Sequence, residues 1–130
     1  MSRIIWDDSY SVGIKEIDEQ HKQWIGIINE LHDSLIEGKE LTEIGRKSLL
    51  AMEEYGIFHF TFEERYMEKI GYTDLPHHKR EHEHFLQEIR QVIRDEEAGH
   101  LVLNTEIMGM LMNWLTRHIT GSDKKYSATV

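Results

Sequence analysis

The sequence predicts an all-α protein that folds as an up-down-up-down four-helix bundle. The chain has 130 residues, enough for one domain with its own core, and its single Pro and few Gly favour helix. Four segments repeat apolar residues at alternating spacings of three and four, the period of an amphipathic helix. Short loops join them, so neighbouring helices should run antiparallel. We expect one domain over 1–130, with an arm over about 1–12, the bundle over about 13–121 and a short tail.

The first two expected helices each carry a histidine in an otherwise apolar seam. The first ends near Gly38, and its seam runs through Ile14, Ile17, His21, Trp24, Ile28, Leu31 and Leu35. Thr42 is placed to cap the second helix, in which Glu63 lies beside the seam histidine. The second seam is Met52, Tyr55, His59, Phe62, Tyr66 and Ile70.

The third and fourth expected helices repeat this pattern. Gly71 closes the second helix, and Asp74 and Pro76 open the third as a capping residue and a first-turn proline. The third seam is Leu75, His78, His82, Phe85, Ile89 and Val92. After a break near Gly99 the fourth seam follows, and Gly121 is a natural stop for it. That seam is Ile107, Leu111, Trp114 and His118.

Composition and charge exclude several classes of protein. The chain has no Cys, so it forms no disulfide, and a metal must be held by nitrogen and oxygen. A net charge of -9 argues against a nucleic-acid partner. No stretch reaches the roughly 18 apolar residues of a membrane span, and Asp7 and Asp8 interrupt any signal core. We expect a cytoplasmic, monomeric protein.

Polar groups inside the seams need compensation. A lone histidine in an apolar seam is more often a core residue with a hydrogen-bond partner than a ligand. Five such histidines and Glu63 share one small core here, and each unsatisfied polar group costs about 1 to 3 kcal/mol. That sum rivals the roughly 5 to 15 kcal/mol by which a whole domain is stable. A bound metal that all of them coordinate removes the cost.

The spacing of the polar residues supports a shared metal site. His59 and Glu63 lie four residues apart, as do His78 and His82, so each pair occupies one helix face. Asp123 follows His118 by five residues, which turns it away on a regular helix. Either the helix ends at Gly121 and the chain curls back, or it widens into a π-type turn.

The number of candidate ligands indicates two metal ions. Seven nitrogen and oxygen ligands are too many for tetrahedral zinc and suit iron. If both carboxylates bridge two ions and a hydroxide is shared, about eleven of the twelve positions around two six-coordinate irons are filled. The remaining position is where dioxygen would bind. The seven expected ligands are His21, His59, Glu63, His78, His82, His118 and Asp123.

At these residues the sequence resembles the hemerythrin family, and in particular its stand-alone, single-domain bacteriohemerythrins. The family pattern of a lone His followed by H-x-x-x-E, H-x-x-x-H and H-x-x-x-x-D is matched at all seven positions, over nearly the whole chain. The resemblance implies that His78, His82 and His118 complete a six-coordinate iron and that His21 and His59 hold a five-coordinate one. Glu63 and Asp123 would bridge them.

The resemblance also implies a function and a cofactor. It implies two Fe ions with a bridging oxo or hydroxo group, and reversible O2 binding at this non-haem di-iron centre. The protein would store oxygen or carry it to O2-consuming enzymes, and would not itself be an enzyme. Two alternatives remain open at this point: O2 or redox sensing through a separate partner protein, and a di-iron peroxidase or iron oxidase.

Apolar residues near the ligands are expected to surround the bound O2, because water or acids there would protonate it and release it as peroxide. Ordinary core packing is the alternative for each of these residues. Asp18 and Glu64 are candidate acceptors for imidazole N–H groups, or else belong to a solvated face. The other four histidines, His32, His77, His84 and His100, are expected on the surface. The expected O2 pocket consists of Trp24, Phe60, Trp114, Leu115 and Ile119.

Overall fold

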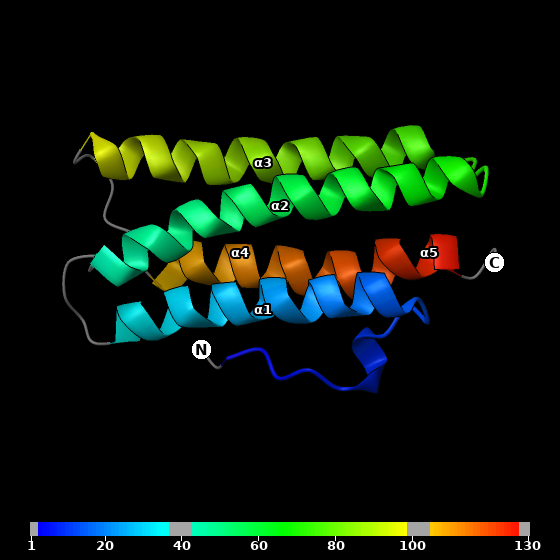
Figure 1. Cartoon of the computed structure of the whole chain (residues 1–130). Coiled ribbons are helices and arrows are strands. Elements are labelled where there is room, and N and C mark those ends of the chain that lie inside the picture. Colours follow the sequence, from blue (N-terminus) through cyan, green and yellow to red (C-terminus); the bar gives the residue numbers. More distant parts are fainter. Residues whose placement is uncertain (1–2, 37–42, 99–104, 128–130) are drawn as a thin grey trace.

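The computed structural model describes residues 3–36, 43–98 and 105–127, and within them the protein is all-α, without a strand. Four long helices, α1 to α4, lie side by side, and each runs in the opposite direction to the one before it (Figure 1). The predicted four-helix bundle is therefore confirmed. The elements in order are η1 (Asp8–Tyr10), α1 (Lys15–Ile36), α2 (Glu43–Lys69), α3 (Leu75–Glu97), α4 (Thr105–Arg117), η2 (His118–Ser122) and α5 (Asp123–Ser127).

The N-terminal arm is tied to the outside of α1. The backbone N–H of Ile4 donates to Asn29 Oδ1 at 2.9 Å, and Asn29 Nδ2 donates back to the Ile4 carbonyl at 2.7 Å. The arm then turns at Gly13, whose φ of 77° lies in the left-handed region that glycine adopts without strain. The Asp18 carboxylate accepts from the Val12 N–H at 2.9 Å and so fixes the entry into α1.

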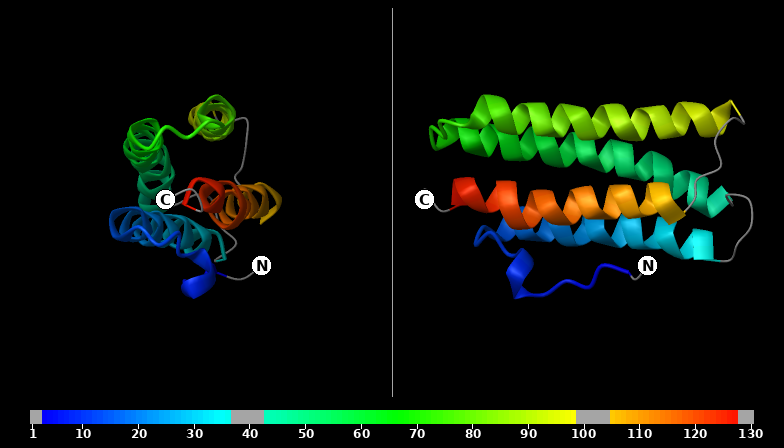
Figure 2. Two further views of the ribbon diagram at one scale, coloured as in Figure 1. Left: turned by 90° about the vertical axis from the view of Figure 1, so that its right-hand side faces the viewer. Right: turned by 180° about the vertical axis from the view of Figure 1, so that it is seen from behind.

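The predicted seams are correct for α1, α3 and α4 wherever their side chains are described. On α2 the predicted seam is correct at Met52 and His59, which are buried, but wrong at Phe62, which is 36% exposed. The cause is that α2 carries apolar residues around much of its circumference, so Phe62 fits the helical periodicity although it lies outside the buried face. The buried face is the one that contacts α1 and α3, the two helices beside α2 in the end-on view of Figure 2.

Helix α2 ends and helix α3 begins where the sequence predicts. Gly71 has a φ of 69°, and the N–H groups of Gly71 and Tyr72 donate to the carbonyls of Glu68 and Met67, which is a Schellman motif. Pro76 lies in the first turn of α3, although the side chain of Asp74 forms no capping hydrogen bond. Gly38, Thr42 and Gly99, which were expected at other helix ends, lie outside the described residues.

The core is divided into two apolar clusters with polar side chains between them. The larger cluster includes Trp24, Phe60 and Phe85, and the smaller one is centred on Ile17, Met67 and Tyr126. His21 lies between Ile17 and Trp24 along α1, and Glu63 lies between Phe60 and Met67 along α2. No helix in the described part of the chain is both long enough and apolar enough to cross a membrane.

Candidate metal centre

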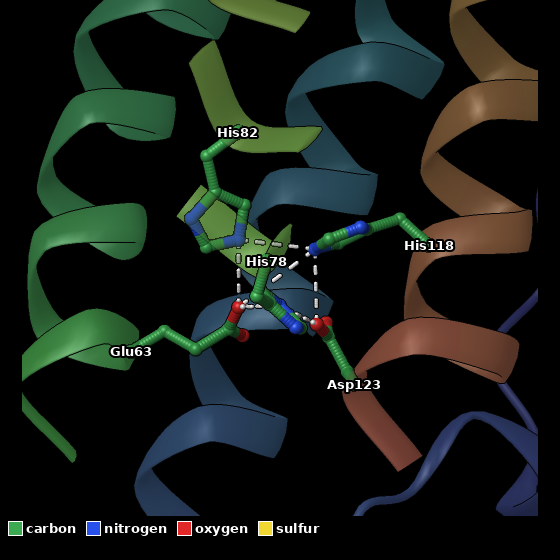
Figure 3. A group of neighbouring side chains, drawn as sticks. All are labelled: Glu63, His78, His82, His118 and Asp123. Atoms are coloured by element: carbon green, nitrogen blue, oxygen red, sulfur yellow. Dashed lines mark hydrogen bonds and ion pairs between the residues drawn. The ribbon is translucent and has the colours of Figure 1, made fainter. Parts of the chain in front are cut away.

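All seven residues expected to bind metal point into one buried region between the helices. None of them is more than 4% exposed. Figure 3 shows five of them pointing toward one another. The contributions are His21 from α1, His59 and Glu63 from α2, His78 and His82 from α3, His118 from η2 and Asp123 from α5.

Three histidines surround one oxygen of each carboxylate. Glu63 Oε1 lies 2.9 Å from the Nε2 atoms of both His78 and His82. Asp123 Oδ1 lies 2.9 Å from His78 Nε2 and 3.0 Å from His118 Nε2. These five ligand atoms, with Nε2 of His82 and His118 3.1 Å apart, fall within 4.8 Å of one another.

The other two histidines surround the second oxygen of each carboxylate. His59 Nε2 lies 3.1 Å from Glu63 Oε2, and His21 Nε2 lies 3.0 Å from Asp123 Oδ2. The two Nε2 atoms of His21 and His59 are 3.0 Å apart. Glu63 and Asp123 thus belong to both clusters, each directing one oxygen to the three-histidine side and the other to the two-histidine side.

A π-helix brings Asp123 into the site. Residues His118–Ser122 form this π-helix, and the N–H of Asp123 donates to the His118 carbonyl, five residues back. The wider turn leaves His118 and Asp123 on one face, and both are buried. Of the two alternatives that the sequence allowed, the π-type turn is the correct one. Gly121 lies inside it and does not end the helix, which continues as α5.

Oxygen atoms behind three of the histidines fix their orientation. The Nδ1 atoms of His59, His82 and His118 lie 2.8, 2.7 and 2.9 Å from oxygens of Gln20, Glu64 and Glu81. An Nδ1–H that donates outward leaves the Nε2 lone pair directed at the centre of the site. Glu64 therefore has the contact expected of it.

Asp18 does not have the contact expected of it, because its carboxylate binds Ser11 and Val12 at the start of α1. The contacts of Gln20 and Glu81 were not predicted from the sequence. Gln20 directly precedes His21, and Glu81 lies one helical turn from His77 and directly before His82, but exposed helix faces carry such residues everywhere.

Tyr126 is a further contact that the sequence did not reveal. Its hydroxyl is completely buried and donates to Glu63 Oε2 at 3.1 Å. Burial and the neighbouring carboxylates raise the pKa of Tyr126 far above its usual value, so the hydroxyl keeps its proton. Tyr126 follows Asp123 by three residues, so the π-helix that positions Asp123 also positions this hydroxyl.

The charges of the site are strongly coupled in the protein without bound metal. Burial lowers the pKa of His21, but hydrogen bonds to Asp123 and Glu63 outweigh burial and raise it to about 9. Burial lowers the pKa of His59, and a protonated His21 adds to this effect. Burial opposes ionisation of Glu63, yet the surrounding histidines hold its pKa well below the usual value. The region thus favours two carboxylates and an added positive charge.

The donor atoms fit a pair of metal ions. Two ligands at right angles around an ion at about 2.1 Å lie about 3.0 Å apart, which is the separation found here between Nε2 atoms and carboxylate oxygens. The Nε2 atoms of His21 and His59, 3.0 Å apart, are close enough to share either a proton or a metal ion. Asp123 Oδ2 is buried and meets no well-aligned hydrogen-bond donor although His21 Nε2 lies 3.0 Å away, as expected for two atoms that share a metal ion.

Apolar side chains pack against the ligating rings. Phe60 stacks on His82 with ring centroids 3.9 Å apart, and Trp114 stacks on His118 at 4.6 Å. Trp24 lies 5.6 Å from the ring of His59. Leu115 and Ile119 are fully buried in the same cluster, and Trp114 is half-buried. These five are the residues expected around O2, and all of them also serve as core.

Of the remaining histidines, two are exposed as predicted and one is buried. His77 and His84 are exposed, with side chains 52% and 65% accessible, as predicted. His32 is buried at 3% exposure, so its predicted surface position is wrong. It sits one residue from Leu31, on the edge of the α1 seam, where it turns inward. His100 lies outside the described residues.

The fold and these two clusters define a helical-bundle protein with a buried cation-binding centre. Residues 12–130 match the family model described as "Hemerythrin HHE cation binding domain". The chain belongs to the hemerythrin family.

Relatives with known names support this membership over the whole chain. The chain is 36% identical over 126 residues to "Bacteriohemerythrin" of Pseudomonas aeruginosa, covering 97% of this chain and 80% of that protein. It is 33% identical over 130 residues to "Bacteriohemerythrin" of Stenotrophomonas maltophilia, covering 100% of this chain and 83% of that protein. A crystal structure of wild-type hemerythrin superimposes with a TM-score of 0.90 and 29% identity, covering 98% of both chains.

Proposed function

We propose that the chain binds O2 reversibly at a non-haem di-iron centre and stores oxygen or carries it to O2-consuming enzymes. Membership of the hemerythrin family supports iron and O2 as the cofactor and the ligand. The residues that would hold the two iron ions are His21, His59, Glu63, His78, His82, His118 and Asp123.

The division of the two carboxylates between the clusters is the observation that carries this proposal. A single metal ion would use one oxygen from Glu63 and one from Asp123. Here the Oε1 and Oδ1 atoms face three histidines, while Oε2 and Oδ2 face the other two. Each carboxylate is therefore oriented as a bridge between two ions.

The unequal number of histidines provides one open position. Three histidines and two carboxylate oxygens make five ligands on one side, and two histidines with two oxygens make four on the other. If an oxo or hydroxo group were shared, it would add one ligand to each side, and the side of His21 and His59 would have about one position of six to spare. Iron ions held by these residues would supply the electrons for reversible O2 binding.

The protein around the centre serves to keep it dry and correctly oriented. Trp24 and Phe60 exclude water from the histidine rings, and their ring centroids are 5.2 Å apart. Gln20, Glu64 and Glu81 hold protons on the outward Nδ1 atoms, which keeps the inward Nε2 atoms free to bind metal. Tyr126 directs its proton at Glu63 and fixes the orientation of that carboxylate.

Iron analysis with visible spectra of one anaerobic sample tests the proposal. We expect two iron ions per chain, and a charge-transfer band that appears in air and disappears under argon. One iron per chain, or no band that depends on oxygen, would contradict the proposal. Rapid, irreversible bleaching in air would favour the di-iron peroxidase or iron oxidase instead.

A pair of matched variants connects this result to the site. Glu63→Gln keeps the shape of the side chain but removes the charge that both ions share, so we expect it to lose both ions and not one. His84→Gln changes an exposed histidine and should retain both. Equal iron content in the two variants would argue against Glu63 as a ligand.

A further inference from the structure

One large ring lies beside the two-histidine side of the metal centre. Trp24 follows His21 by three residues, so it lies about one turn further along the same face of α1. Its ring centroid is 5.6 Å from that of His59, the other histidine on this side. Trp24 is therefore next to His21 along α1 and in contact with His59 on α2.

The ring of Trp24 is held in place by its surroundings. It meets Phe60 and Phe85 edge-on, with ring centroids 5.2 and 5.4 Å apart. Its Nε1–H donates to the Met52 carbonyl at 3.3 Å, and the residue is fully buried. A ring fixed in this way cannot swing aside for a ligand without breaking the hydrogen bond and the packing around it.

A glycine on α2 makes room for this ring. A Cβ added at Gly56 would lie 3.2 Å from Cζ2 of Trp24, which is closer than most such contacts. Trp24 therefore fills the space between α1 and α2 up to the backbone of α2. A ligand that binds beside His21 and His59 has to fit into the space that this ring leaves.

The three-histidine side has a tryptophan of its own, in a different setting. Trp114 stacks on the ligand His118, with ring centroids 4.6 Å apart and 12° between the planes, and it is half-buried. With a shared oxo or hydroxo group, three histidines and two carboxylate oxygens would fill all six positions there. Of these two tryptophans, Trp24 is thus the one on the side where a further ligand would bind.

We infer that Trp24 limits the size of the ligand that binds beside His21 and His59, so that diatomic ligands enter and longer ones are excluded. The inference rests on the proposed function, since it takes this position as the one that binds O2. A close-packed interior accepts extra atoms only by displacing side chains, and Trp24 is the side chain to be displaced. Its one polar group is already bonded to Met52, so Trp24 selects by shape alone.

A series of anions of increasing length tests the inference on the full chain loaded with ferric iron. Fluoride is monatomic, cyanide diatomic and azide triatomic, and all three carry one negative charge. Visible spectra measure the dissociation constant of each anion. We expect azide to bind Trp24→Leu about tenfold or more tightly than it binds wild type, because the wild-type core would be overpacked. Fluoride and cyanide should bind both proteins equally.

The three tryptophans of the chain provide matched controls. Trp6→Leu removes the same volume on the N-terminal arm, where the ring lies 5.1 Å from Lys22 Nζ, and should leave azide binding as in wild type. Trp114→Leu removes it beside His118 and should gain much less azide affinity than Trp24→Leu. Trp24→Phe, which disturbs the core least, should fall between wild type and Trp24→Leu. Circular dichroism and iron content check that each variant is folded and loaded.

Three results would overturn the inference. One is equal azide affinity in wild type and both variants at Trp24. Another is an equal gain in Trp24→Leu and Trp114→Leu, because the ligand would then not bind beside Trp24 in particular. The third is a gain for fluoride and cyanide as large as that for azide, which would indicate a change in the iron and not in the available space.

The anion series also separates this inference from the proposed function, because no step of it involves O2. A chain that shows the expected series but does not release O2 under argon contradicts the proposed function and leaves the size limit in place. A chain that binds O2 reversibly but treats all three anions alike in every variant contradicts the size limit alone.

Discussion

Buried hydrogen bonds from residues outside the ligand set hold the metal ligands in place. Tyr126 is the deepest of these, because it is fully buried and its hydroxyl bonds to Glu63, one of the two shared carboxylates. A hydrogen bond to a carboxylate withdraws charge from it, which weakens its electron donation to a bound metal. Tyr126 thus connects the smaller apolar cluster directly to the electronic properties of the site.

Replacing Tyr126 with Phe should keep the fold and both metal ions but alter their environment. Loss of a hydrogen bond to a buried acceptor should lower the free energy of unfolding by about 1 to 2 kcal/mol. The stronger carboxylate donor should also lower the reduction potential of the metal centre and shift its visible spectrum. Tyr72→Phe, which changes a half-buried ring beside Tyr126, is the control and should leave the potential unchanged.

The free energy of unfolding of the metal-free protein should depend on pH through the Glu81 carboxyl. Its hydrogen bond from His118 lowers the pKa of the Glu81 carboxyl from 4.5 to about 2. A carboxyl with a depressed pKa stabilises the fold at pH values above its unfolded pKa, and this contribution is lost as pH falls toward the folded pKa. The stability difference between wild type and Glu81→Gln should therefore be larger at pH 5 than at pH 3, as measured by urea unfolding. A difference that grows toward pH 3 would contradict this.

The gathering of the seven expected ligands in one buried cluster could be predicted residue by residue, but their supporting contacts could not. Each of the five histidines interrupts an apolar seam, and this is a signal that sequence carries. Gln20, Glu81 and Tyr126 meet their partners from other helices, 39, 37 and 63 residues away in sequence. No local pattern marks such contacts. His32 was wrongly predicted to lie on the surface, because the buried face of a helix has no sharp edge. A residue beside the seam can point either into the core or toward solvent.

The packing of α1 against α2 depends on one glycine. A Cβ added at Gly56 would lie 3.2 Å from Cζ2 of the Trp24 ring. That ring cannot move easily, because it donates to the Met52 carbonyl at 3.3 Å and packs edge-on against Phe60 and Phe85. The glycine therefore allows the close approach of the two helices that carry His21, His59 and Glu63.

Substitution of Gly56 should change the free energy of unfolding in the opposite direction to substitution of Gly26, which has open space around it. Gly56→Ala should lower the free energy of unfolding by about 1 kcal/mol, since overpacking of about 1 to 3 kcal/mol outweighs the gain in helix propensity. Gly26→Ala on α1, where nothing lies within 4 Å, should raise it by about 0.5 to 1 kcal/mol. Thermal unfolding of both variants checks the prediction, and two changes of the same sign would refute it.

At the level of whole helices, the sequence left one uncertainty and produced one error. The spacing of His118 and Asp123 showed that a regular helix could not continue, but a chain reversal and a wider turn both fit that spacing. The π-helix is favoured by packing, since α5 must continue to bring Tyr126 to Glu63. Phe62 of α2 was wrongly assigned to the core because periodicity measures amphipathicity and does not mark where the buried face of a helix ends.

The whole molecule should be held together by its metal. Five imidazoles and two carboxylates face one another in the core, and without metal ions these buried groups must be compensated by protons on the histidines. Removal of metal by a chelator should lower the free energy of unfolding by about 4 kcal/mol, if free metal had exceeded its dissociation constant about a thousandfold. Urea unfolding of loaded and chelated samples measures this. Identical midpoints would show that the site contributes nothing to stability.

The bundle itself could be predicted because its causes are spread along the whole chain. Helical periodicity, turn glycines at Gly13 and Gly71 and the proline at the start of α3 all act locally and all favour the same fold. What the sequence could not supply is the arrangement of one helix against another across the site. Those distances depend on side-chain packing from four helices at once.

With two ions bound as proposed, the shared carboxylates would make the two halves of the site one cooperative unit. An ion on the three-histidine side would fix Glu63 and Asp123, and the opposite oxygens would then be oriented for a second ion. By the reciprocity of linked equilibria, the second ion strengthens the first by the same factor. Half-filled molecules should then be scarce at every stage of a metal titration, and native mass spectrometry should find chains with two ions or with none.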